Sequence, residues 1–219
     1  MATWMAHLRV ADGVLKQCNQ LSKEEYIMGN IAPDSGVPSR DWTTFQPPKA
    51  VSHYRMVDAE GKSSLHPEIF AKQYLREEQR EQYTGKQYSF YLGYYHHLLV
   101  DVLWGTTIFD PAKVTYKKDY ETDRVAAIWK WKADWYDLDF LFLEKNPHME
   151  AWDIYSHLKG FHNTYLDFFP QNAFEDRQAY ITEFYKEKKE NLHREYPYLN
   201  EIQMDEFIQL AISQNQTIM

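Results

Sequence analysis

The sequence predicts an all-α fold: a single compact helical domain over residues 1–219, built around a buried central helix. Apolar residues recur at helical spacing through most of the chain. Strand signals are scarce, since Val114-Thr115-Tyr116 is too short to form a sheet. No internal repeat, low-complexity tract or linker-like stretch divides the 219 residues, a length that suits one domain.

The first two helices are expected over residues 3–19 and 22–30. The apolar stripe of the first helix has His7 beside it, so we expect this side chain to face inward. Ser22 and Glu25 have the spacing of a capping box, which predicts the start of the second helix.

A long irregular loop is expected over residues 31–66. The segment shows no sustained period of a helix or a strand, and it carries two glycines and several prolines. Loops of this length are uncommon in compact domains and are more often functional than idle. The prolines are Pro33, Pro38, Pro47 and Pro48.

The remaining chain reads as helices, of which the one over about 86–104 is the most informative. This helix has apolar and aromatic residues on two faces, which predicts that it is buried at the centre of the fold. The helix before it is expected to begin at Pro67 and to end before Gly85. Other helices are expected over residues 67–83, 121–143, 150–168, 175–195 and 203–214.

The composition excludes several classes of protein. The formal net charge of −8 opposes nucleic-acid binding through the overall field. No apolar run is long enough for a transmembrane segment, and the N-terminal residues do not resemble a secretory signal, so we expect a cytoplasmic protein. The single cysteine, Cys18, excludes an internal disulfide and a multi-cysteine zinc site. The sequence gives no signal for an oligomeric state.

His97 and Asp101 are the first candidates for chemistry. They are spaced i,i+4, so they share one face of the central helix, and aromatic residues such as Phe90 and Tyr94 lie on the same face. A buried carboxylate is costly unless it is paired or binds a metal. Two interpretations remain open: a structural His–Asp pair or a metal site. His96 points about 100° away round the helix and is not expected to be a ligand.

Three further residues extend this pair to a candidate ligand set. His7 is expected to face inward, while Asp34 and His53 lie in the long loop. Each has an ordinary structural explanation when taken alone. Together they give three histidines and two aspartates, the ligand types that zinc takes when thiolates are absent. Tyr94 and Asp137 are candidates for supporting positions around such a site.

The order of these residues resembles the zinc-dependent phospholipase C family, whose superfamily includes single-strand-specific zinc nucleases. The resemblance rests on His7, on Gly29-Asn30-Ile31-Ala32-Pro33-Asp34, on His53 and on His97-Leu98-Leu99-Val100-Asp101, and it covers residues 1–104. It implies an all-α, zinc-dependent hydrolase that cleaves phosphoester bonds.

The chain departs from this family pattern in two places. Secreted members bind a metal through an N-terminal tryptophan and carry a further histidine and a His-x-x-x-Glu pair. This chain has Trp4, but no His-x-x-x-Glu follows Asp101. The resemblance therefore implies one or two zinc ions, or another divalent metal, rather than a full three-metal site.

The same resemblance implies a mechanism in which a metal-activated water attacks phosphorus. Asp101 corresponds to the aspartate that bridges two metals in the family. Asp34 is the candidate to orient the water or to act as general base, because it reaches the site from a loop. Arg55, in the same loop as His53, is a weak candidate for contacting the substrate phosphate. A small-molecule phosphoester and a lipid phosphoester are both open as the substrate.

Two other functions are alternatives to this one. Helical phosphohydrolases that use a contiguous His-Asp dipeptide also bind metals with His and Asp, but this sequence has no such dipeptide. The second rival is a non-catalytic protein in which the metal, or a polar network, holds the long loop to the helices. Metal analysis and turnover of a generic phosphodiester separate these possibilities.

Overall fold

The computed structural model describes residues 1–41 and 43–217, and the described part confirms the all-α class. In this part of the chain, no helix combines enough length with enough apolar character to span a bilayer. The helices are α1 (Trp4–Leu15), α2 (Lys23–Ile31), α3 (Lys49–Ser52), α4 (Pro67–Tyr74), α5 (Glu77–Arg80), α6 (Gly85–Trp104), α7 (Asp110–Thr115), α8 (Lys117–Thr122), α9 (Arg124–Lys145), α10 (Glu150–His157), α11 (Ala173–Lys186) and α12 (Glu201–Gln216).

The segment over residues 31–66 is more regular than the sequence predicts. It begins with the 3₁₀ turn η1 (Ala32–Asp34) and contains the short helix α3. Two antiparallel hairpins flank α3 and use strands too short for periodicity to reveal. The first hairpin pairs β1 (Val37–Pro38) with β2 (Phe45–Gln46), and the second pairs β3 (Arg55–Val57) with β4 (Ser63–Leu65).

Several helices end earlier than their apolar pattern predicts. The expected helix over 150–168 stops at His157, because Leu158 is extended and Gly160 has a φ of 67°. Asn163 then organises the following turn, since its amide donates to two backbone carbonyls and its carbonyl accepts from two backbone N–H groups. Such side-chain bonds compete with a continuing helix. The expected helix over 67–83 is likewise divided into α4 and α5.

Helix α6 is the buried centre, as predicted. Thr84 caps it, with its hydroxyl accepting from the Gln87 N–H in a capping box. Side chains on both faces are buried, among them Phe90, Tyr94 and Trp104. The helix continues through the π-helical turn η2 (Gly105–Phe109) into α7 without a loop.

Helix α2 packs against α6 with the two backbones nearly in contact. A Cβ atom on Gly29 would lie 2.2 Å from the Phe90 carbonyl oxygen, and one on Gly93 would lie 2.3 Å from the Tyr26 carbonyl oxygen. Only glycine fits at either place. This close approach fixes the C-terminal end of α2, and the η1 turn after it, beside the middle of α6.

The N-terminal end of α2 is joined to α6 by polar contacts, which replace the predicted capping box. Ser22 is the N-cap residue, but its hydroxyl bonds the Glu25 carboxylate and makes no bond to the helix backbone. The same carboxylate pairs with Lys86 at 2.8 Å, and the Ser22 N–H donates to Ser89 Oγ at 2.9 Å.

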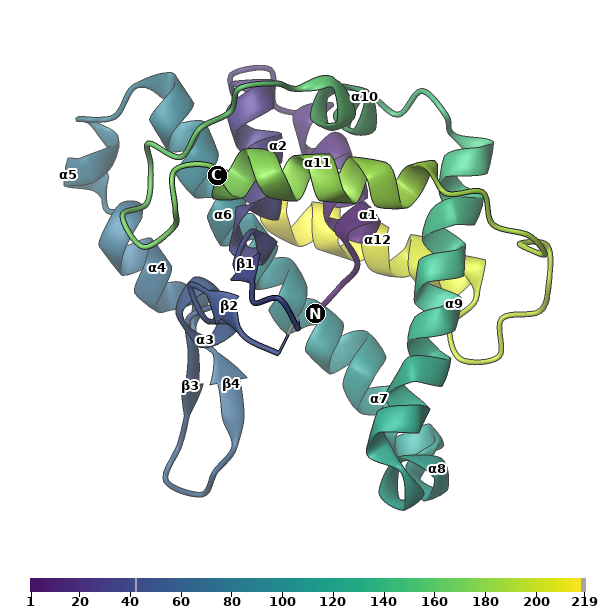
Figure 1. Cartoon of the computed structure of the whole chain (residues 1–219). Coiled ribbons are helices and arrows are strands. Elements are labelled where there is room, and N and C mark those ends of the chain that lie inside the picture. Colours follow the sequence, from purple (N-terminus) through teal and green to yellow (C-terminus); the bar gives the residue numbers. More distant parts are fainter. Residues whose placement is uncertain (42, 218–219) are drawn as a thin grey trace.

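The other helices surround this pair. Helix α1 packs against α2, α10 and α12, which places its inner face toward α6. Figure 1 shows α11 and α12 crossing on either side of α1, with α9 along one flank and the β-hairpins on the opposite flank. The N-terminal residues run into the middle of the molecule, between α9 and the hairpins.

Candidate metal centre

All five candidate ligands converge in the core. All five residues are buried: the side chain of Asp34 is 6% exposed, and the other four side chains are fully buried. Their ligand atoms form two overlapping groups, in each of which the atoms lie within 4.8 Å of one another. We call the five residues together the candidate centre. They are His7 from α1, Asp34 from η1, His53 directly after α3, and His97 and Asp101 from α6.

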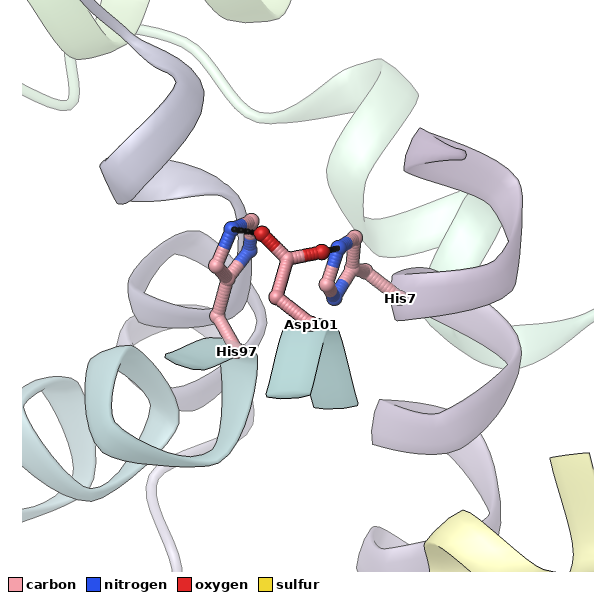
Figure 2. A group of neighbouring side chains, drawn as sticks. All are labelled: His7, His97 and Asp101. Atoms are coloured by element: carbon pink, nitrogen blue, oxygen red, sulfur yellow. Dashed lines mark ion pairs between the residues drawn. The ribbon is translucent and has the colours of Figure 1, made fainter. Parts of the chain in front are cut away.

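Asp101 lies at the edge of the stacked rings of His7 and His97, with one carboxylate oxygen toward each ring (Figure 2). Its Oδ1 is 3.5 Å from His7 Nε2, and its Oδ2 is 3.6 Å from His97 Nε2. The backbone N–H of Ala2 also donates to Oδ1, at 2.8 Å. Oδ2 lies 3.7 Å from His53 Nε2 as well, so this carboxylate faces all three imidazoles.

The second group contains Asp34, His53 and His97. The Asp34 Oδ1 atom is 3.4 Å from His53 Nε2, and the rings of His53 and His97 have centroids 5.3 Å apart. Ser52 Oγ lies 2.9 Å from His53 Nδ1, which fixes the ring with Nε2 toward the carboxylates. The short helix α3 therefore serves to deliver His53 to the centre.

The orientation of His97 is set by the backbone of α2. Its Nδ1 lies 2.7 Å from the carbonyl oxygen of Asn30, an acceptor only, so Nδ1 must carry the proton. The lone pair of the neutral ring is then on Nε2, which faces Asp101. A backbone carbonyl that accepts from the other ring nitrogen, and so selects one tautomer, is typical of metal-binding histidines.

Several buried polar atoms of the centre lack hydrogen-bond partners. These are both nitrogens of His7, the Nε2 atoms of His53 and His97, and Oδ2 of Asp101. Buried polar atoms in native proteins are nearly always satisfied, so each such group requires an explanation. Neutral imidazole nitrogens beside carboxylate oxygens are the donor set that zinc prefers without thiolates, and the residues present therefore fit that ion.

The protonation states agree with this fit for most of the centre. Burial, and repulsion from His97, lower the pKa of His7 to about 4. Burial disfavours ionisation of Asp101, but the N-terminal amine, His7 and His97 together hold its pKa well below the ordinary value. Burial also opposes the ionised form of Asp34, but the neighbouring imidazoles of His53 and His97 outweigh burial, so its pKa is lowered. Metals bind ionised carboxylates and neutral imidazoles.

His97 is the exception. Burial disfavours its charged ring, but Asp101, Asp34 and the Asn30 carbonyl outweigh burial and raise its pKa. The proton on His97 is thus held by the same carboxylates that would bind a cation. A cation in the centre would replace that proton.

The three other site candidates lie in different surroundings. Tyr94 donates to the backbone carbonyl of Ser52 at 2.5 Å, so it supports the residue that orients His53. Asp137 accepts from Arg194, with its Oδ2 2.7 Å from Nη2 and 3.1 Å from Nε, rather than contacting the centre. Arg55 donates to Ser63 Oγ at 3.1 Å within the β3–β4 hairpin. His96, expected to stay outside the site, lies 2.6 Å from the Tyr26 hydroxyl.

Asp139 fixes the N-terminal segment, a role that is not among those predicted from the sequence. Its carboxylate is buried and accepts from Thr3 Oγ1 at 2.8 Å and from the Tyr185 hydroxyl at 2.7 Å. Thr3 follows Ala2, whose N–H donates to Asp101. A signal for this role existed, because Asp139 is i+4 from Trp135 on the buried face of α9.

A cavity of about 640 Å³ opens beside the centre and was also missed. Asp34 lies on its wall, so one carboxylate belongs both to the cavity and to the centre. Three cationic side chains share the lining: Lys49, Lys132 and Arg177. They come from separate elements, α3, α9 and α11, and no local pattern brings them together. The aromatic walls are formed by Trp4, Phe45, Phe109, Trp129, Trp135, Tyr136 and Tyr180.

Comparison with known proteins agrees with the donor set. Neither the comparison with curated proteins nor the comparison with solved structures finds a match. Residues 5–215 match the model of the family described as zinc dependent phospholipase C. The match spans nearly the whole chain and includes all five residues of the centre. The chain therefore belongs to the zinc-dependent phospholipase C family.

Proposed function

We propose that the chain hydrolyses a phosphoester with zinc held by His7, Asp34, His53, His97 and Asp101. Family membership supports a zinc-dependent hydrolase in general. One observation carries the finer proposal. Asp34 lies on the cavity wall and is 3.4 Å from His53 Nε2, a buried nitrogen with no hydrogen-bond partner. A substrate in the cavity would therefore meet the donor set at Asp34.

The geometry favours Asp101 as the residue shared by two ions, if two bind. The two ligand groups overlap at His97, but this ring has only Nε2 free because Nδ1 donates to Asn30. The His97 ring can therefore bind only one ion. Asp101 has an oxygen facing each side, and Oδ2 lies 3.7 Å from His53 Nε2. A carboxylate can bridge where an imidazole cannot.

Zinc bound here would offset negative charge on the phosphoester and lower the pKa of a water toward about 7. Residues of the chain orient the water, exclude solvent and bind the substrate. Asp34, an acceptor at the boundary between cavity and centre, orients a water and accepts a hydrogen bond from it. The buried rings of His7 and His97 exclude bulk solvent from the inner side. The aromatic walls of the cavity hold the apolar part of the substrate.

The proposed substrate class is a phosphoester of a small molecule or a lipid head group. The family description names a phospholipase C, which acts on lipid phosphoesters. A cavity of about 640 Å³ is in the size range of small-ligand sites. The chain itself contributes cations around the position where a phosphate would enter.

The proposal is tested by turnover of the zinc-loaded protein. The panel contains p-nitrophenyl esters of phosphate and phosphorylcholine, and a phospholipid in mixed micelles. We expect release of p-nitrophenol or diacylglycerol by the parent and none by Asp101→Asn, since an amide cannot supply the negative charge that holds the cation. Asp137→Asn is the matched control and should retain turnover. An inactive parent, or an active Asp101→Asn protein, would contradict the proposal.

A further inference from the structure

We infer that the cavity beside Asp34 selects phosphoesters that carry more than one negative charge, with Lys49 and Lys132 as the recognising groups. This inference rests on the proposed function and narrows its substrate class. The two lysines come from α3 and α9, and both line the cavity whose wall includes Asp34. Their charges act on Asp34 and on one another.

The charges in the cavity are not balanced. No carboxylate of residues 1–41 or 43–217 forms an ion pair with Lys49 or Lys132. Lys132 is half-buried, and burial together with repulsion from Lys49 lowers its pKa, which Asp34 only partly opposes. Two like charges at one cavity are unfavourable, and an anion bound to both removes that cost.

Arg177 adds a third positive charge whose position is fixed. Its side chain is buried, and Nη2 donates to the Gly36 carbonyl oxygen at 2.7 Å. The cavity lining thus combines three cationic side chains with one carboxylate, Asp34. Zinc in the centre would increase the positive excess. A monoanionic phosphate alone leaves this excess uncompensated, whereas a substrate with a second anionic group reduces it.

The aromatic lining argues against a quaternary ammonium head group. Aromatic faces are the usual partners of such cations. Here the Lys49 ammonium lies 5.2 Å from the centroid of the Phe45 ring, and the Lys132 ammonium lies 4.9 Å from that of Trp129. The cavity's own cations therefore cover these faces, and a ligand cation beside them would be repelled.

The binding test uses inorganic pyrophosphate and phosphocholine, titrated by calorimetry into chelator-treated and zinc-loaded protein. Pyrophosphate should bind both forms more tightly than phosphocholine. Lys49→Met and Lys132→Met should each weaken pyrophosphate about tenfold, the size expected when one charge-assisted contact is lost. Lys130→Met is the matched control, because Lys130 is exposed on the same helix outside the cavity, and it should change nothing.

Equal affinity for the two probes, or equal weakening by Lys130→Met, would overturn the inference. A turnover arm separates it from the proposed function. The lysine variants should raise KM for p-nitrophenyl phosphate more than KM for the phosphorylcholine ester, and Lys130→Met should change neither. If the protein turns over both esters without preferring the more negatively charged one, the charge selectivity is wrong and the proposed function stands. If the protein hydrolyses neither ester but still binds pyrophosphate through the two lysines, the proposed function is wrong and the anion-binding cavity stands.

Discussion

The imidazole ring of His7 stacks on that of His97, with centroids 3.8 Å apart and planes within 8° of parallel. The two residues come from different helices, α1 and α6, and both are buried. Two stacked, buried imidazoles cannot both be charged, and the pKa of His7 is accordingly lowered to about 4 by burial and by His97. At neutral pH this leaves His7 neutral, with the lone pair that a metal ligand requires. Neither of its ring nitrogens has a hydrogen-bond partner.

The contact between α2 and α6 should be necessary for the centre. We expect Gly93→Ala to destabilise the fold by about 1–3 kcal/mol, because the new methyl group overlaps the Tyr26 carbonyl. It should also weaken zinc binding, since it displaces Asn30 from His97. Urea unfolding and zinc titration measure the two effects.

Gly105→Ala is the control for that substitution. Gly105 has helical dihedrals, and a Cβ atom there meets nothing within 4 Å. We expect this variant to match the parent or to gain about 0.4–1 kcal/mol. Equal losses in both variants would mean that the close approach of α2 to α6 is unimportant.

Tyr94 should support the centre through Ser52. Tyr94→Phe removes the donor to the Ser52 carbonyl, and we expect zinc affinity to fall about tenfold, as is usual when an outer hydrogen bond to a metal ligand is lost. Tyr95→Phe, at the next position on α6, should leave zinc affinity unchanged. Competition with a chromophoric chelator measures both. If Tyr94→Phe binds zinc as tightly as the parent does, Tyr94 does not support the centre.

Asp139 should make stability depend on pH. Burial raises the pKa of its carboxyl to about 7, above the ordinary 3.8. The folded state therefore keeps a proton that the unfolded chain releases. The stability it contributes is complete below about pH 4 and is lost as pH rises to about 7, by a few kcal/mol at most.

Asp139→Asn should abolish this loss, because the amide can accept from Thr3 and donate to the Tyr185 oxygen without ionising. We expect the variant to gain stability relative to the parent between pH 4 and pH 8, measured by urea unfolding at each pH. A constant difference between the two proteins across that range would show that Asp139 does not titrate there.

Asp137 should be structural and not part of the centre. Asp137→Ala removes the bidentate contact with Arg194, a partly exposed pair, and should cost about 1 kcal/mol. Zinc content per chain should equal that of the parent. A variant that folds but loses zinc would restore Asp137 to the supporting role that the sequence suggested.

The sequence predicts those parts of the molecule that a single helix encodes. The i,i+4 spacing of His97 and Asp101, on a helix apolar on both sides, was enough to place both side chains inward. The family-like order of residues added His7, Asp34 and His53, and the structure brings all five together.

The features that the sequence does not predict depend on long-range contacts. Lys49, Lys132 and Arg177 meet at one cavity only because α3, α9 and α11 pack around the N-terminal segment. The early end of α10 depends on the turn that Asn163 organises, which competes with helical periodicity. The sequence suggests a supporting role for Asp137, whereas the structure gives the buried position to Asp139.

The most direct test of the candidate centre is anomalous scattering at the zinc absorption edge, from crystals grown with zinc. We expect a peak about 2.0–2.2 Å from His97 Nε2 and from an oxygen of Asp101, and a ring nitrogen of His7 at the same distance from it. Crystals of Asp101→Asn should lack that peak. A well-ordered parent crystal with no peak at the centre, and with His7 and His97 hydrogen-bonded to Asp101 instead, would contradict the account.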